Sequence, residues 1–148
     1  MIKSEKVYRK FIAEKTKEIC LSLGLPTVTQ VLQEVRISAK PFEGMQNIKK
    51  GQCRIDILAI HEDESLSLFE LKIKSDTHNM SGGITQLLTY ESIISENKPS
   101  SKLNLFLVTP EEDIDAGKMC RKYNLPVRLI VATQDYFSEY ESIKANNG

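Results

Sequence analysis

Two acidic residues and one lysine lie inside segments that otherwise read as apolar strands. Asp56 is flanked by two isoleucines, and Glu70 is flanked by a phenylalanine and a leucine. Their separation, 70 − 56 = 14 residues, includes the polar stretch 61–65, which is typical of a hairpin turn. A hairpin centred there would place the two carboxylates side by side on neighbouring strands.

This pair of carboxylates predicts a divalent cation site. Two like charges at such a distance raise each other's pKa unless positive charge lies between them. Mg²⁺ prefers hard oxygen ligands and keeps several waters, so two carboxylates and a substrate suffice. Lys72 follows Glu70 by two residues and therefore projects from the same face of a strand. Its ammonium could hold a phosphate or orient an attacking water, which indicates phosphodiester hydrolysis.

Each of these residues also has a purely structural interpretation. Asp56 could pair with Arg54 or Lys72 near a turn. Glu70 and Lys72 could form a weak ion pair on a solvated strand face. The combination of all three, rather than any one, favours the catalytic interpretation.

Two helical segments offer further candidates. Gln86 and Tyr90 are four residues apart, hence neighbours on one helical face that could contact a DNA backbone. The alternative is a core tyrosine beside a solvated glutamine. In the first helix, Glu14 and Glu18 flank the apolar stripe, and either could point toward the metal or remain on the surface.

The elements that position these residues follow from apolar periodicity and from turn residues. Ser4 is a plausible N-cap of the first helix, and Gly24 with Pro26 ends it. The two glycines at 82 and 83 precede the second helix. The predicted elements are a helix over 4–23, strands over 27–37, 53–60 and 66–73, a helix over 84–95, a strand over 103–109, a helix over 110–123 and a strand over 127–131. The order predicts a mixed sheet with helices on its faces, its first three strands antiparallel and its later ones parallel.

Composition sets wider limits. The 148 residues fit one domain over 1–148, with a core at about 4–131 and a tail at 132–148 that is expected to add a helical turn. The formal net charge is zero, from 20 basic and 20 acidic residues, which argues against a general basic coat. Three widely spaced cysteines and the lack of a long apolar run favour a soluble, reduced protein in the cytoplasm, away from membranes.

The pattern resembles the PD-(D/E)XK nuclease superfamily, in particular its RecB-like and archaeal Holliday-junction-nuclease-like members. The residues that carry the resemblance are Asp56, the triplet Glu70-Leu71-Lys72, and Gln86 with Tyr90 on the following helix. An isoleucine stands where the family often has a proline, before Asp56. The resemblance covers about residues 4–131 and implies the restriction-endonuclease-like αβββαβ fold.

The resemblance also implies roles for these positions. Asp56, Glu70 and the Leu71 carbonyl would bind Mg²⁺, for which Mn²⁺ could substitute, and Lys72 would be the catalytic lysine. Gln86 and Tyr90 would be auxiliary residues. Family members often carry a first-helix glutamate near the metal, for which we choose Glu14 and keep Glu18 open.

The expected activity is a metal-dependent DNA endonuclease or exonuclease, a hydrolase in repair, recombination, restriction or mobile-element biology. DNA is the expected partner, and a homodimer would allow two strands to be cut. The alternative is a subunit with the nuclease fold that binds DNA or assembles without cutting. Glu34 is a further acid that could lie at the edge of the site, and the candidate basic contacts are Lys40, Lys49, Lys50, Arg54 and Lys74.

Overall fold

The computed structural model describes residues 4–37, 41–42, 54–74 and 77–140, and the description below is limited to them. The elements in chain order are α1 (Glu5–Ser22), β1 (Val28–Arg36), β2 (Arg54–His61), β3 (Leu66–Leu71), α2 (Thr77–Asn97), β4 (Leu103–Thr109), α3 (Ile114–Lys122), β5 (Val127–Ala132) and β6 (Phe137–Tyr140).

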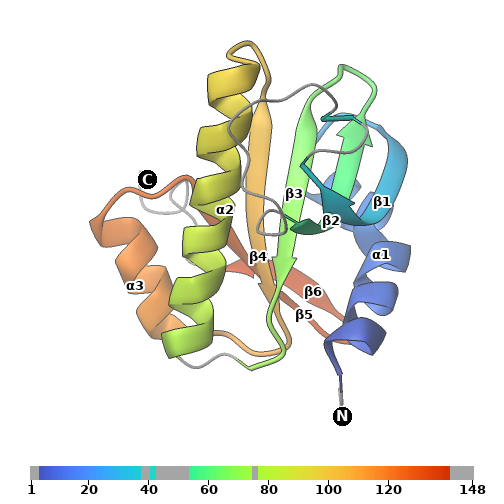
Figure 1. Cartoon of the computed structure of the whole chain (residues 1–148). Helices are drawn as coiled ribbons and strands as arrows, with labels where there is room; N and C mark the ends of the chain where they lie inside the picture. The colour runs from blue at the N-terminus through green and yellow to red at the C-terminus, as the bar shows by residue number, and fades with distance from the viewer. Residues whose placement is uncertain (1–3, 38–40, 43–53, 75–76, 141–148) are drawn as a thin grey trace.

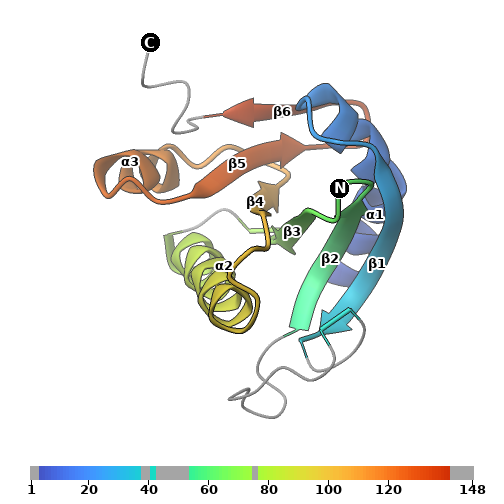
Figure 2. The same ribbon diagram turned by 90° about the horizontal axis from the view of Figure 1, so that it is seen from above.

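A single twisted sheet runs through the described part of the chain in the order β1-β2-β3-β4-β5-β6. Strands β1, β2 and β3 form an antiparallel meander, β3, β4 and β5 are parallel, and β6 returns antiparallel to β5. Helix α1 covers one face of the sheet, and α2 and α3 cover the other (Figures 1 and 2). The expected α/β class, with a mixed sheet between helices and an αβββαβ core, is confirmed.

Helix α1 begins and ends where its sequence predicts. The Ser4 side chain accepts a hydrogen bond from the amide of Val7 at 3.2 Å, which satisfies one of the free amides of the first turn. Gly24 has a φ of +74°, the left-handed conformation that glycine adopts at little cost after a helix. Local chemistry alone therefore sets the length of the helix whose first turn lies near Glu70.

Apolar side chains form one core on each face of the sheet. Tyr8, Ile12 and Ile19 of α1 pack on the first face with Phe69 and Phe106, whose rings stack. On the second face, α2 and α3 pack on the alternate residues of the same strands. Parallel strands buried on both faces favour continuous apolar side chains, as β4 has over residues 105–108. None of the described helices is long and apolar enough to cross a lipid bilayer.

Helix α2 starts earlier than its two glycines predict. It begins at Thr77 and includes Gly82 and Gly83, which were expected to precede it. A Cβ atom at Gly83 would lie 2.6 Å from Cδ1 of Leu107 and 3.5 Å from Cε of Lys72. With glycine at this position the helix packs against β4 without displacing the Leu107 side chain. The helical cost of glycine, about 1 kcal/mol, is offset by tertiary packing.

The C-terminal segment also differs from its prediction. Residues 137–140 form the edge strand β6 rather than a helical turn. Arg128 on β5 holds Glu139 on β6 through two hydrogen bonds of 2.6 and 2.8 Å. Cross-strand pairing with β5 therefore decides the conformation of a segment that has only weak local preference.

Candidate active site

Strands β2 and β3 bring the two predicted carboxylates together. Ile57 pairs with Phe69, so the antiparallel register places Asp56 opposite Glu70. Oδ2 of Asp56 accepts a hydrogen bond from the backbone amide of Leu71 at 2.9 Å. In Figure 1 this is the lower end of β3, toward which the first turns of α1 and α2 also lie.

The Glu70 carboxyl is almost fully buried, with 3% of the residue exposed. Burial, followed by repulsion from Asp56 and a hydrogen bond with it, raises the pKa of Glu70 to about 9. The positive charge of Lys72 opposes this shift. At neutral pH the protonated form of the Glu70 carboxyl is therefore favoured, and its ionisation requires additional positive charge nearby.

The chemistry of these donors fits Mg²⁺. Oε2 of Glu70 is buried and has no hydrogen-bond partner among the described residues. A buried carboxylate oxygen without a donor is costly unless a cation or another ligand satisfies it. No group of three or more histidine, cysteine or acidic side chains in the described part of the chain is arranged to hold a metal ion. The fit to Mg²⁺ therefore rests on two carboxylates, with waters and backbone oxygen completing the shell.

Lys72 and Gln86 lie on the α2 side of the same cluster. Lys72 follows Glu70 by two residues, so both side chains project from the same face of the sheet. The Cε atom of Lys72 lies close to Gly83 of α2. Gln86 follows Gly83 by about one helical turn, so it faces the same region. Its Oε1 atom is buried and has no hydrogen-bond partner among the described residues. The helix therefore adds a free acceptor beside the lysine.

Tyr90 is placed differently from the predicted DNA contact. It is a core aromatic with 2% of its surface exposed, and its hydroxyl donates a hydrogen bond to the carbonyl of Arg54 at 2.9 Å. Arg54 is the first residue of β2, two before Asp56. Tyr90 therefore holds the start of the strand that carries Asp56 and cannot reach a nucleic acid without leaving the core.

Replacing Tyr90 by phenylalanine should lower the free energy of unfolding by about 1 kcal/mol, because one buried hydrogen bond is lost and the Arg54 carbonyl is left without this donor. Urea denaturation would measure the change. The matched control is Tyr136→Phe, which removes an exposed hydroxyl that contacts Ser138 and should change stability by less than about 0.5 kcal/mol. Equal effects of the two variants would contradict the anchoring role.

The first-helix glutamates are not brought to the cluster. Glu14 and Glu18 are exposed. Glu14 follows the buried Ile12 by two residues, which turns it roughly 200° away from the sheet. Glu5 is the acidic residue of α1 whose charge reaches Glu70, where it raises the pKa. Its spacing from Tyr8 and Ile12, three and seven residues, was a periodicity signal that could have identified it.

The two histidines differ in burial. His61 ends β2 and is buried, with Nδ1 2.7 Å from the Pro26 carbonyl and Nε2 2.6 Å from Oγ of Ser67. It links strands at the far end of the hairpin from Asp56. His78 lies exposed in the first turn of α2.

The basic candidates are only partly described. Arg54 and Lys74 are exposed. Lys40, Lys49 and Lys50 lie outside the described residues.

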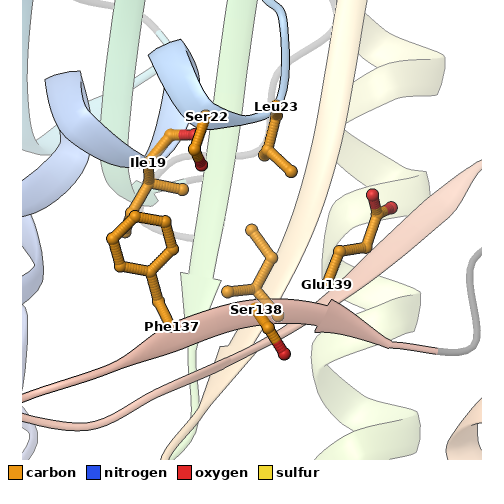
Figure 3. A pocket seen from close by; sticks show the side chains of 7 residues that line it. Ile19, Ser22, Leu23, Phe137, Ser138 and Glu139 are labelled. Atoms are coloured by element: carbon orange, nitrogen blue, oxygen red, sulfur yellow. The ribbon is translucent and has the colours of Figure 1, made fainter.

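A cavity of about 230 Å³ lies away from the carboxylates, between the end of α1 and strands β5 and β6 (Figure 3). Its lining residues are Ile19, Ser22, Leu23, Ile130, Phe137, Ser138 and Glu139. Its acidic side chain, Glu139, already pairs with Arg128. Asp56, Glu70 and Lys72 do not line this cavity, so it is separate from the candidate active site.

Comparison with solved structures gives two similar proteins. A repair endonuclease from Pyrococcus abyssi is 20% identical over 90% of this chain and 49% of its own, with a TM-score of 0.52. An EndoMS-dsDNA2 complex is 19% identical over 81% of this chain and 44% of its own, with a TM-score of 0.43. The chain has the restriction-endonuclease-like fold.

This fold is the one that the resemblance to the PD-(D/E)XK superfamily implies, so that expectation is confirmed. The chain spans about half the length of the Pyrococcus abyssi protein. No protein-family model matches the chain. No curated protein matches it either.

Proposed function

We propose that this chain is a metal-dependent deoxyribonuclease that hydrolyses phosphodiester bonds. The observation that carries the proposal is the buried Glu70 carboxyl opposite Asp56 and beside Lys72, at one end of a restriction-endonuclease-like sheet. The fold by itself hosts many functions, so the argument depends on these side chains. The two solved structures described above include a repair endonuclease and a complex with dsDNA, which favours DNA as the substrate and repair as the setting.

Asp56, Glu70 and the Leu71 carbonyl would hold Mg²⁺, with Mn²⁺ as a substitute. The ion, when bound, would polarise a phosphate and lower the pKa of water. The Leu71 amide fixes the Asp56 carboxylate in place, so this ligand needs little reorganisation. The Lys72 ammonium would stabilise the charge that develops on the phosphate. Gln86 would accept a hydrogen bond from that ammonium or from a water, and Glu5 would add negative charge at the cation site.

The test is cleavage of a panel of labelled DNAs (duplex, mismatched duplex, flap, junction and single strand) with Mg²⁺, Mn²⁺ or EDTA. The parent should cut at least one substrate with either ion and none with EDTA. Lys72→Met should lower the rate about 10²- to 10³-fold, because it removes one electrostatic stabiliser. The matched control is Lys102→Met, which changes an exposed lysine at the opposite end of β3 and β4 and should leave the rate unchanged.

The second candidate is a nuclease-fold subunit that binds or assembles without cutting. The net charge of zero favours the assembly role, because nucleic-acid-binding domains commonly carry a basic excess. DNA binding in EDTA without cleavage of any panel member under either ion would select this candidate. Sedimentation with and without DNA would also test the proposed homodimer, which provides a second active site for the second strand.

A further inference from the structure

A second charged cluster joins three elements, α1, β1 and β2. Nη1 of Arg9 on α1 lies 3.3 Å from Oε1 of Glu34 on β1, and Nη1 of Arg54 on β2 lies 3.7 Å from the same oxygen. One carboxylate oxygen thus faces two guanidinium groups, and the cluster carries a net charge of +1. Arg9, Arg54 and Glu34 together form the arginine cluster.

The backbone at Glu34 has an unusual conformation that serves this arrangement. Its φ is +51°, in the left-handed region that residues with a Cβ atom rarely adopt. Regular alternation would place Leu32 and Val35, three residues apart, on opposite faces, yet both pack in the α2-side core. Here the irregular residue carries the carboxylate that both arginines contact.

The arginine cluster lies at the same end of the sheet as the candidate active site. Val35 pairs with Ile55 and Gln33 with Ile57, so Glu34 lies across from Asp56 on the neighbouring strand. Arg54 precedes Asp56 by two residues. On α1, Arg9 follows Glu5 by four residues, about one helical turn.

The two arginines are held loosely and retain free donors. For comparison, Arg128 forms a pair with Glu139 in which both carboxylate oxygens accept a hydrogen bond, at 2.6 and 2.8 Å. In the arginine cluster both contacts are longer and end on one oxygen. Nε of Arg9 is buried with no hydrogen-bond partner among the described residues. The Arg54 side chain is 57% exposed. Guanidinium groups with free donors are well suited to bind a phosphate through paired hydrogen bonds.

We propose that Arg9 and Arg54 bind a backbone phosphate of the DNA substrate next to the scissile one. Glu34 is the counterion that holds the two guanidinium groups in place before DNA arrives, and the phosphate takes over its position. The inference rests on the proposed function, because it takes DNA as the substrate. It adds a binding residue pair that positions the strand over Asp56 and Glu70.

The test measures DNA binding by fluorescence anisotropy in EDTA, over a series of salt concentrations, so that cleavage plays no part. Arg54→Gln should weaken binding roughly 10-fold, the loss expected for one charge-assisted hydrogen bond. It should also reduce the slope of log K against log salt by about 0.9. Arg9→Gln should act in the same direction, with thermal melting to check that the fold is retained.

Glu34→Gln is the decisive variant, because the proposal predicts that it raises the affinity for DNA. It frees both guanidinium groups from their counterion, so DNA binding should tighten roughly 3- to 10-fold, as for the loss of one competing ion pair. The matched control is Glu64→Gln. Glu64 also has a left-handed φ, +70°, and is exposed in the turn at the opposite end of β2 and β3. It should leave the affinity nearly unchanged.

Unchanged or weaker binding by Glu34→Gln would overturn the inference, as would an equal gain from Glu64→Gln, which would indicate a general charge effect. Absence of DNA binding by the parent would overturn it as well. The two proposals fail separately. A protein that binds DNA through these arginines but never cuts it contradicts only the nuclease activity. A protein that cuts DNA, but whose affinity for DNA is unchanged by substitutions in the arginine cluster, contradicts only the phosphate site.

Discussion

Asp56→Asn is expected to lower the Mg²⁺-dependent cleavage rate at least about 100-fold. Mutation of a residue that only hydrogen-bonds to a metal ligand already lowers metal affinity or activity about 10- to 100-fold, and Asp56 is proposed to be a ligand itself. The amide oxygen of asparagine can still accept the hydrogen bond from the Leu71 backbone, so the strand ends should stay in register. The negative charge opposite Glu70 is lost, and with it one of the two carboxylates proposed to hold the ion.

Single-turnover cleavage at saturating Mg²⁺ would measure this effect, with thermal melting as the check of folding. Asp135→Asn is the matched control, because Asp135 is exposed and lies beyond β5. This variant should cut at the parent rate. A folded Asp56→Asn protein that cuts within a few-fold of the parent would remove Asp56 from the catalytic site. It would leave the fold assignment untouched.

Glu70→Gln is expected to stabilise the metal-free protein at pH 8, by an amount of the order of a few kcal/mol. The pKa of Glu70 is raised from its ordinary value of 4.5 to about 9, chiefly by burial and next by the charge of Asp56. Glutamine cannot ionise. It offers Asp56 an N–H donor in place of the proton that the Glu70 carboxyl otherwise supplies.

The direction of the pH dependence follows from proton counting. Between pH 4.5 and about 9 the folded protein retains a proton on Glu70 that the unfolded chain has lost. The unfolded state then binds fewer protons, so the free energy of unfolding falls as pH rises. The full stability is present below pH 4.5, and the loss is complete above about pH 9. The stability gained by Glu70→Gln should therefore be near zero at pH 4 and largest near pH 9.

Urea denaturation of both proteins in EDTA, at several pH values from 4 to 9, would measure this difference. Mg²⁺ should stabilise the parent increasingly with pH, because binding favours the ionised carboxylates, and should stabilise Glu70→Gln less. A difference between the two proteins that does not depend on pH would mean that Glu70 is ionised in the folded state. The buried pair would then need another source of positive charge.

Much of the site follows from local sequence features. The polar turn between two apolar segments sets the β2–β3 hairpin, and strand alternation places Lys72 on the face of Glu70. The cap at Ser4 and the stop at Gly24 define α1. These features were predictable because each depends on residues close together in the chain, where backbone geometry leaves few alternatives.

Other features depend on contacts between distant segments. Helix α2 runs through Gly83 because it packs against Leu107, and Tyr90 is buried because its hydroxyl reaches Arg54, 36 residues away. Residues 137–140 form a strand because β5 offers a partner. Local preference alone decides none of these outcomes, since tertiary packing overrides a propensity of about 1 kcal/mol.

The sequence by itself determined which residue types could bind a metal ion and a phosphate, together with the fold class and the alignment of Asp56 with Glu70. Only the tertiary structure decided which glutamate of α1 lies near them, because that depends on the rotation of the helix against the sheet. It also decided the raised pKa of Glu70 and the left-handed Glu34 between two arginines. Burial and through-space charge act between residues that are remote in sequence, and they arise only when the layers pack together.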